Sequence, residues 1–105
     1  MKKEVQLPTK DEIIEKIRKE KKYLSEKYFI TEIGLFGSYV RGEQKKKSDV
    51  DILIDYDHSK GLSLFDIVDL TDHLTTLFGV KTDVALKNSL KTAIGYYILK
   101  EVVYI

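Results

Sequence analysis

Cysteine is absent from the 105-residue chain. This absence excludes disulfide bonds, thiolate nucleophiles and cysteine-ligated zinc sites together. Long apolar runs are missing as well. No stretch approaches the length of a membrane span, and the two lysines near the start are followed by no apolar segment of the kind that targets a chain for export. We therefore expect a cytoplasmic protein.

The chain also has almost no excess of charge of either sign. Its 18 basic and 17 acidic residues leave a formal net charge of +1. No global field would draw such a protein to nucleic acid or to a membrane surface. The length predicts a single domain, residues 1–105, with a modest core but without a separate lid or specificity domain. Surface from a partner would then have to complete its function, and assembly with itself or with another chain is left open.

Two common phosphate-binding motifs are missing. The glycines are not followed by the Gly-Lys-Ser/Thr of a P-loop, and the chain has no G-x-G-x-x-G of the dinucleotide-binding type. The one stretch that suits phosphate chemistry is Gly37–Asp51, which reads GSYVRGEQKKKSDVD and precedes the apolar run Ile52–Ile54. It predicts a strand that ends at Phe36, a break at Gly37, a short helix over Ser38–Arg41 and a second strand after the loop.

The first half of this stretch offers groups that bind phosphate. Gly37 lets the backbone approach a ligand closely, and the amides after it and the Ser38 hydroxyl would point at phosphate oxygens. Arg41, one turn further on, would pair with a phosphate in bidentate fashion, with a strand-end carboxylate, or in a plain surface ion pair. Ser48 joins this nucleotide-binding set, although its main expected role is to fix the turn before Asp49.

The second half of the stretch carries paired carboxylates. Asp49 and Asp51 are two residues apart and would share one face of a strand. Their repulsion would raise the pKa of each unless a cation lies between them. Hard oxygen ligands favour Mg²⁺ or Mn²⁺, whose coordination a nucleoside triphosphate can complete. Asp55 and Asp57 continue the spacing but are expected to be exposed residues at the strand end.

The pattern G-S-x-x-R-G-x(5)-S-D-x-D resembles the signature of the DNA polymerase β-like nucleotidyltransferase superfamily. The short chain is similar to its smallest members, the minimal nucleotidyltransferases of MNT/HEPN toxin–antitoxin pairs, also called MntA-like antitoxins. In that superfamily a third carboxylate on an adjacent strand completes the metal site. The resemblance implies Asp83 for this role, in a strand expected over Val80–Leu86.

The same resemblance implies an activity. AMP would pass from ATP to a tyrosine hydroxyl of a partner HEPN ribonuclease toxin, and the chain would be the antitoxin of a type VII-like pair. Asp49, Asp51 and Asp83 would hold two Mg²⁺ or Mn²⁺ ions, and Asp83 would help to deprotonate the hydroxyl. Gly37 and Ser38 would hold the β- and γ-phosphates. Two alternatives stay open: adenylylation of a small molecule, and a non-catalytic antitoxin that acts by binding alone.

The rest of the chain predicts an α/β fold: a small mixed sheet of three or four short strands with helices mainly on one face. We expect a helix from Asp11 to about Lys27, a strand over Phe29–Phe36 in which Gly34 permits a close approach of another backbone, and a helix between a Ser63–Asp66 capping box and Gly79. The buried stripe of that helix would comprise Leu64, Ile67, Val68, Leu70, Leu74, Leu77 and Phe78.

The C-terminal part is expected to form a last helix, capped by Asn88 or Ser89. This helix would carry Leu90, Ile94, Tyr97 and Ile98, with Tyr97 in the core. Val102–Ile105 would form a short edge strand or a contact for a partner. The tyrosines Tyr96, Tyr97 and Tyr104 and the loop Lys45–Lys47 are further candidates for that contact, which for Tyr97 competes with its place in the core. His58 and His73 are expected to lie on the surface.

Overall fold

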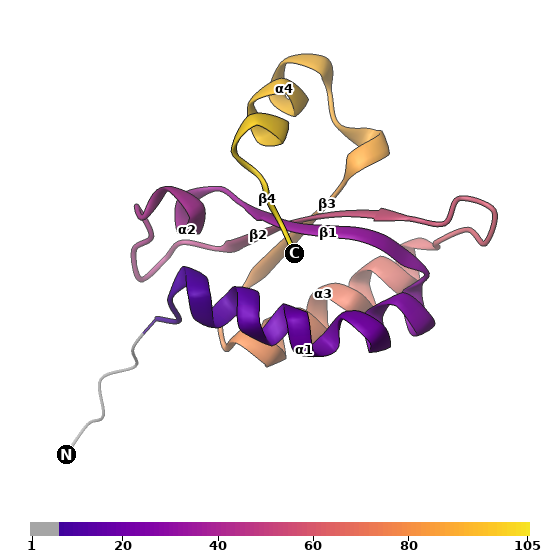
Figure 1. Ribbon diagram of the computed structural model, residues 1–105, viewed down its shortest axis with the longest axis horizontal. Helices are drawn as coiled ribbons and strands as arrows, with labels where there is room; N and C mark the ends of the chain where they lie inside the picture. Colours follow the sequence, from indigo (N-terminus) through magenta and orange to yellow (C-terminus); the bar gives the residue numbers. More distant parts are fainter. Residues whose placement is uncertain (1–6) are drawn as a thin grey trace.

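The computed structural model describes residues 7–105, and the expected α/β fold and element order are confirmed (Figure 1). The elements are α1 (Lys10–Tyr28), β1 (Ile30–Phe36), α2 (Ser38–Arg41), β2 (Val50–Tyr56), α3 (Leu64–Phe78), β3 (Thr82–Leu86), the 3₁₀ turn η1 (Lys87–Ser89), α4 (Thr92–Glu101) and β4 (Val103–Tyr104). The two lysines near the start belong to residues 1–6, which lie outside the described part. No helix within residues 7–105 is long and apolar enough to cross a membrane.

The four strands form one mixed sheet in the order β3-β2-β1-β4. β1 is antiparallel to both β2 and β4, whereas β2 and β3 run parallel and are joined through α3. Helices α1 and α3 cover one face of this sheet, and α4 stands over the opposite face (Figure 1). The sheet therefore has one well-covered face, and among the helices of residues 7–105 only α4 overlooks the other face.

The core lies between the sheet and the pair α1 and α3. It consists of apolar side chains that recur at helical spacing on the two helices and at alternate positions on β2. The members from these three elements are Ile13, Ile17, Leu24 and Tyr28, then Leu70, Leu74 and Phe78, then Val50, Ile52 and Ile54. Because alternate residues of β2 point into this core, Asp49 and Asp51 are directed to the other face.

Local signals set the helix ends. Ser63 accepts from the backbone amide of Asp66, and the Asp66 carboxylate accepts from the amide of Ser63, which confirms the expected capping box. Gly79 ends α3 in the left-handed conformation, also as expected. Phe29 ends α1 with φ of 59°, so β1 begins at Ile30 and the expected start of that strand is one residue too early.

The tail forms the expected edge strand. β4 pairs with Gly34 and Leu35 of β1. A Cβ atom at Gly34 would lie 2.6 Å from Cγ2 of Val102 and 3.1 Å from the carbonyl oxygen of Val103. Glycine at this position therefore permits the close approach of another backbone that the sequence indicates.

Three expectations about burial are wrong. Leu64 is 79% exposed and Val68 is 59% exposed, because no other part of the chain within residues 7–105 covers this side of the first turns of α3. Tyr97 is 71% exposed because α4 buries only Gly95. His73 is half-buried, with Nε2 3.2 Å from Oε1 of Glu20, and so connects α3 to α1.

The start of the last helix also differs from the expectation. Residues Lys87–Ser89 form the 3₁₀ turn, and Leu90 follows it in an extended conformation. α4 begins only after Lys91, which makes no side-chain capping bond. Neither Asn88 nor Ser89 caps α4, because both lie in the 3₁₀ turn and Leu90 and Lys91 separate them from Thr92, the first residue of the helix.

Candidate functional site

The predicted acids meet at one edge of the sheet, where β1 ends and β2 and β3 begin. In the parallel register Asp51 of β2 is paired directly with Asp83 of β3, and in the antiparallel register it is paired with Phe36 of β1. Asp49 immediately precedes β2, and its Oδ2 lies 3.7 Å from Nζ of Lys81, which precedes β3. The structure therefore brings Asp49, Asp51 and Asp83 to the same edge.

These carboxylates disturb one another electrostatically. Burial, followed by the negative charges of Asp83 and Asp49, raises the pKa of Asp51 from 3.8 to about 6. The pKa of Asp83 is also raised, first by loss of hydration and then by the Asp49 carboxylate beside it. A cation between the acids would offset this electrostatic repulsion.

The same carboxylates do not form a closed ligand cage. Within residues 7–105, no three acidic or histidine side chains converge in an arrangement that would hold a metal ion. The donor set nevertheless fits a hard divalent cation in its chemistry, because it offers carboxylate oxygens and no sulfur. The raised pKa of Asp51 and of Asp83 shows that negative charge is crowded there. Such ions typically take few protein ligands and complete their coordination with phosphates and water. Metal binding by these three residues stays a prediction.

Gly37 connects the two halves of the motif. It is buried, has φ of 81°, and its carbonyl oxygen accepts from the amides of Val40 and Arg41 in the single turn of α2. A Cβ atom at Gly37 would lie 2.1 Å from Oδ2 of Asp51. Only glycine lets the chain turn here while the carboxylate packs against it.

The two serines of the motif have different surroundings. Ser38 is the first residue of α2 and directly follows Gly37. Ser48 Oγ accepts from the backbone amide of Lys45 at 2.8 Å, and the Ser48 amide donates to the Lys45 carbonyl at 2.9 Å. These bonds fix the turn before Asp49, which is the main role that the sequence indicates for Ser48. Nucleotide binding by Ser38 and Ser48 stays a prediction.

Sequence reasoning did not find Glu101, the last residue of α4. Nη1 of Arg41 donates to both carboxylate oxygens of Glu101, at 2.9 and 3.0 Å. The backbone amide of Gly37 donates to Oε2 of Glu101 at 2.6 Å. Arg41 thus pairs with a helix-end carboxylate, and its Nε contacts Glu43 at 3.4 Å. One feature of the sequence could have pointed to Glu101: it is an acid expected at a helix C-terminus, where the helix dipole disfavours negative charge.

Tyr39 is a second residue that the sequence did not single out. It is buried in the turn of α2, and within the described residues its hydroxyl has no hydrogen-bond partner. Burial, and then the charge of Asp49, raises the pKa of this phenol. A neutral hydroxyl is therefore held near the site.

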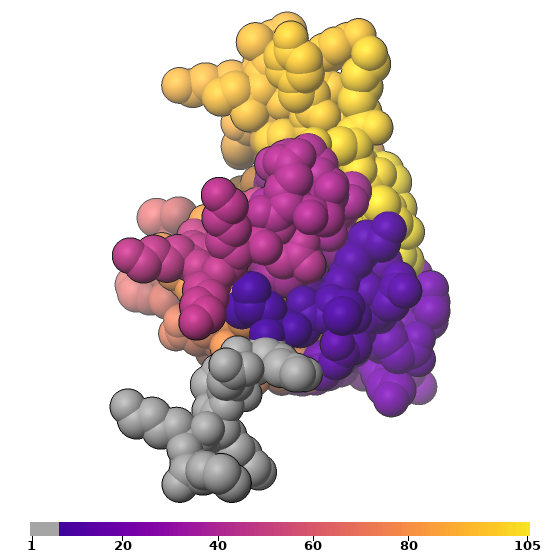
Figure 2. Space-filling model, turned by 90° about the vertical axis from the view of Figure 1, so that its left-hand side faces the viewer, coloured from indigo at the N-terminus to yellow at the C-terminus, as the bar shows by residue number. Residues whose placement is uncertain are grey.

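The site edge lies between two hollows. One, of about 390 Å³, separates α4 from the carboxylate-bearing face of the sheet and is lined by Phe36, Gly37, Arg41, Asp51, Ile94, Tyr97, Ile98 and Glu101. The other, of about 430 Å³, is richer in lysine and is lined by Leu7, Lys46, Lys47, Ser48, Asp49, Gly79, Val80 and Lys81. Figure 2 shows this side of the molecule: the magenta segment of α2 and its loop lies between the yellow C-terminal segment and the indigo start of α1.

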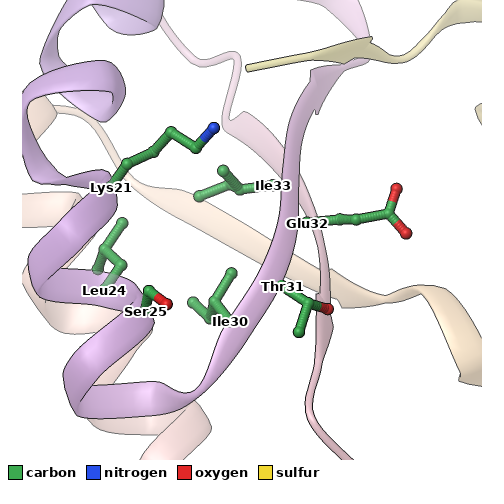
Figure 3. A pocket seen from close by; sticks show the side chains of 7 residues that line it. All are labelled: Lys21, Leu24, Ser25, Ile30, Thr31, Glu32 and Ile33. Carbon is green, nitrogen blue, oxygen red and sulfur yellow. The ribbon is translucent and has the colours of Figure 1, made fainter.

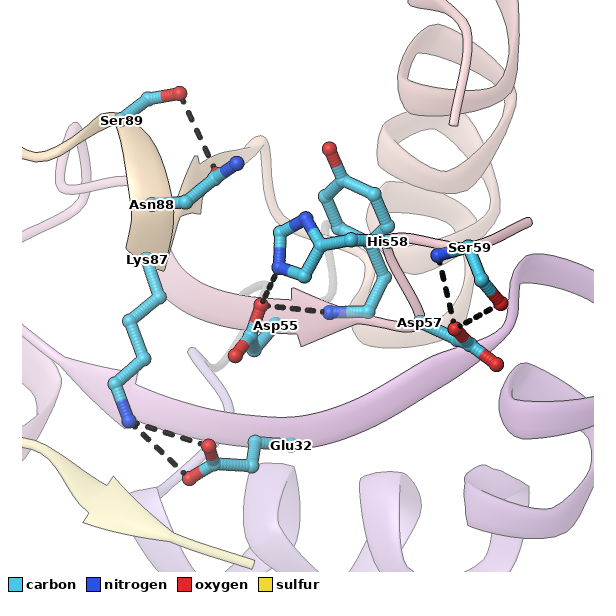
Figure 4. Close-up of polar contacts among 9 residues, drawn as sticks. Glu32, Asp55, Asp57, His58, Ser59, Lys87, Asn88 and Ser89 are labelled. Atoms are coloured by element: carbon cyan, nitrogen blue, oxygen red, sulfur yellow. Dashed lines mark hydrogen bonds and ion pairs between the residues drawn. The ribbon is translucent and has the colours of Figure 1, made fainter. Parts of the chain in front are cut away.

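Other polar and hollow features lie apart from this edge. A cavity of about 290 Å³ between α1 and β1 is lined by Lys21, Leu24, Ser25, Ile30, Thr31, Glu32 and Ile33, none of which the sequence places in the site (Figure 3). At the far end of β2, Asp55 accepts from the amide of Tyr56 and contacts His58, and Asp57 accepts from the amide and hydroxyl of Ser59 (Figure 4). Both acids are thus engaged in local contacts of the strand end.

A mixed sheet with a glycine turn after its first strand, and with acids at the starts of two adjacent parallel strands, defines a class: α/β proteins of the polymerase β-like nucleotidyltransferase fold. The Nucleotidyltransferase domain family model matches residues 12–105, so the chain belongs to this family. It is a minimal nucleotidyltransferase of the DNA polymerase β-like superfamily, and it is an enzyme, as the motif resemblance implies.

Known relatives span nearly the whole chain. The protein adenylyltransferase MntA of Thermococcus cleftensis is 44% identical over 97 residues, which cover 92% of this chain and 96% of the relative. A candidate protein adenylyltransferase of Methanocaldococcus jannaschii is 48% identical over 84 residues, covering 80% of this chain and 84% of the relative.

Solved structures agree on the fold. A candidate minimal nucleotidyltransferase superposes with a TM-score of 0.74 at 25% identity and covers 91% of this chain and 95% of its own. A toxin–antitoxin crystallised with AMP-PNP superposes with a TM-score of 0.68 at 22% identity and covers 92% of this chain and 72% of its own. At 22% identity, the similarity to the toxin–antitoxin shows the fold alone.

Proposed function

We propose that the chain is a Mg²⁺-dependent protein adenylyltransferase that transfers AMP from ATP to a tyrosine of a HEPN ribonuclease toxin and so acts as its antitoxin. The observation that carries the proposal is the direct pairing of Asp51 with Asp83, beside Asp49, at an open edge of the sheet. Support for the adenylyl group and the protein acceptor comes from the relative that is named as a protein adenylyltransferase. We place this activity in the cytoplasm.

The reaction is a displacement at phosphorus. The acceptor hydroxyl oxygen forms a bond to the α-phosphorus of ATP, the bond from that phosphorus to the bridging oxygen breaks, and pyrophosphate leaves. Divalent ions bound by the carboxylates would stabilise the negative charge that develops on the entering and leaving oxygens. Mn²⁺ would serve as well as Mg²⁺, since both prefer oxygen ligands.

Each residue of the site has a place in this reaction. Asp49 and Asp51 hold the cation that accompanies the nucleotide. Asp83 is exposed at the edge and has a raised pKa, so its carboxylate can accept the proton of the acceptor hydroxyl. The amide of Gly37, together with Ser38, binds the terminal phosphates, and Arg41 neutralises part of their charge.

A protein acceptor suits the surface around the site. Helix α4 and the tail expose several large apolar or aromatic side chains: Ile94, Tyr96, Tyr97, Leu99 and Tyr104. A second exposed group on α3 comprises Leu64, Phe65 and Val68. Aromatic side chains are enriched at protein interfaces, and exposed apolar groups of this kind mark partner surfaces. The group on α4 lies beside the hollow that Asp51 lines, so a partner bound there could present its hydroxyl to the site.

The test uses the full chain and the protein encoded beside its gene, co-expressed and purified together. Intact-mass measurement with and without ATP and Mg²⁺ should show the partner gaining one or more AMP units. The variant Asp83→Asn should keep the complex and lose the mass gain. Asp57→Asn, whose carboxylate has only local contacts with Ser59 at the far end of β2, is the matched control and should retain both.

Other outcomes separate the alternatives. A stable complex without any mass gain in the wild-type sample would favour an antitoxin that acts by binding alone. Absence of a complex, with pyrophosphate released in the presence of small hydroxyl acceptors, would favour adenylylation of a small molecule. Persistent modification with Asp83→Asn would remove Asp83 from the catalytic residues.

A further inference from the structure

The carboxylate of Glu101 is bound by the same groups that the proposed function assigns to phosphate. Its Oε2 accepts from the amide of Gly37 at 2.6 Å, and both of its oxygens accept from Nη1 of Arg41 at 2.9 and 3.0 Å. We propose that Glu101 is an internal occupant of the phosphate-binding position, that a nucleoside triphosphate must displace it, and that α4 thereby gates the site. The identity of the ligand rests on the proposed function, whereas the contact itself does not.

The contacts of Glu101 have the chemistry of phosphate recognition. A carboxylate, like a phosphate, presents anionic oxygens to a backbone amide and to a guanidinium. Only 26% of the Glu101 side chain is exposed, and it reaches these donors from the far end of the chain. While it stays there, the Gly37 amide and one nitrogen of Arg41 already have an anionic partner.

The charges at the site also disfavour entry of a triphosphate while Glu101 is in place. Arg41, Asp51 and Glu101 all line the hollow between α4 and the sheet, so two carboxylates face a single guanidinium. A triphosphate that entered with Glu101 in place would meet net negative charge and donors that are already engaged. Departure of Glu101 removes one negative charge and frees Arg41 for the incoming phosphate.

The position of Glu101 makes its displacement feasible. As the last residue of a ten-residue helix it opposes the helix dipole, so α4 gains no stability from this carboxylate on its own. The helix buries only Gly95, and helices of this length are marginal without packing. The contacts of Glu101 with Gly37 and Arg41 are therefore a main attachment of the end of α4 to the site.

The residues after Glu101 supply a fixed anchor for such movement. Val103 and Tyr104 form β4, which pairs with Leu35 and Gly34 of β1. The tail can stay on the sheet while the last turn of α4 swings away. Val102, between the helix and the strand, is where the backbone would bend.

The first experiment measures binding of AMP-PNP with Mg²⁺ to the full chain by titration calorimetry. Glu101→Gln keeps the size of the side chain and removes its charge, so the Kd should fall about tenfold relative to wild type, as expected when a charge-assisted competitor is weakened. Glu43→Gln is the matched control, because Glu43 also contacts Arg41, at 3.4 Å from Nε, but the amide of Gly37 donates to Glu101 and not to Glu43. Its Kd should change by less than about twofold. Equal or weaker binding by Glu101→Gln, in a variant that melts like wild type, overturns the gate.

The second experiment separates this inference from the proposed function. Hydrogen exchange of the amides in residues 92–101 is measured without nucleotide in wild type, Glu101→Gln and Glu43→Gln. Without nucleotide, exchange should be faster in Glu101→Gln than in wild type and Glu43→Gln. In a second measurement, addition of AMP-PNP with Mg²⁺ should accelerate the exchange of these amides in wild type. Unchanged exchange in Glu101→Gln overturns the attachment of α4 even if nucleotide binds. Faster exchange in the variant, with no nucleotide binding by any protein, would retain the attachment and reject both nucleotide gating and the proposed function.

Discussion

The Cβ atom that Gly37 lacks would lie 2.1 Å from Oδ2 of Asp51. Real atoms cannot approach so closely, so the turn after β1 and the acid of β2 pack against each other only because position 37 is glycine. Gly37 also has φ of 81°, a conformation that other residues adopt at a cost. The phosphate-binding half and the carboxylate half of the motif are therefore one packed unit.

Replacement of Gly37 should damage both the fold and the site. Gly37→Ala should lower the free energy of unfolding by about 2–5 kcal/mol, from about 1–2 kcal/mol of backbone strain and about 1–3 kcal/mol of overpacking against Asp51. Nucleotide binding should weaken as well, because Asp51 must move. Urea denaturation and titration calorimetry measure the two effects.

Gly42→Ala is the matched control. Gly42 has φ of 71°, but a Cβ atom there would meet nothing within 4 Å. The control should lose only about 1–2 kcal/mol through strain and keep its affinity for nucleotide. Equal losses of stability and affinity in the two variants would show that the packing of Gly37 on Asp51 has no special importance.

Neutralisation of the paired acids should separate activity from stability. Asp51→Asn and Asp49→Asn should each lower the transfer rate by about 10²-fold or more, which corresponds to several kcal/mol of lost charge stabilisation in the transition state. Neither variant should be less stable than wild type at pH 7, since each removes one of several crowded negative charges. Transfer assays and thermal melting on the same samples test this. Melting far below wild type in both variants would make the two residues structural.

The stability of the metal-free protein should depend on pH through Asp51. Its pKa of about 6 in the folded state exceeds the ordinary 3.8, so the folded state binds the proton more tightly than the unfolded state. This contribution is fully present below about pH 4 and is lost as the pH rises through about 6. It should amount to about 1–2 kcal/mol after allowance for partial exposure of the group.

Comparison with Asp51→Asn isolates this effect from other groups. The pKa values of Asp57 and Asp69 are lowered, so these acids lose stabilisation on acidification and act in the opposite direction. Urea denaturation between pH 4 and 7.5 should show the wild type falling behind Asp51→Asn as the pH rises. Parallel profiles for the two proteins would contradict the raised pKa.

Divalent metal should strengthen binding of ATP. Without metal, the carboxylates of Asp49, Asp51 and Asp83 repel the triphosphate, and with Mg²⁺ this repulsion becomes attraction through the ion. The Kd for ATP should be at least about tenfold lower with Mg²⁺ than with EDTA. Titration calorimetry in the two buffers decides, and equal affinity would remove the metal assignment from all three residues.

Features that depend on neighbours in the chain could be predicted from the sequence. Contacts within a few residues form the short helix Ser38–Arg41, which glycines flank on both sides. Contacts of the same range form the capping box of Ser63 and Asp66. The alternation of β2 directs Asp49 and Asp51 away from the core, again through a local property of a strand. The position of Asp83 was implied by the family resemblance, and the parallel pairing of β2 with β3 confirms that it lies beside Asp51.

Only the tertiary structure decided the features that depend on distant partners. Glu101 is 64 positions from Gly37, and nothing near either residue in the sequence indicates that they meet. Their contact arises because β4 returns to pair with β1 and holds the end of α4 over the site. Tyr97 lies on the apolar stripe of α4 yet is exposed, since an amphipathic pattern states that a face can be buried but not whether another element reaches it. Periodicity is a property of one segment, whereas burial and ion pairing are properties of two segments that the fold brings together.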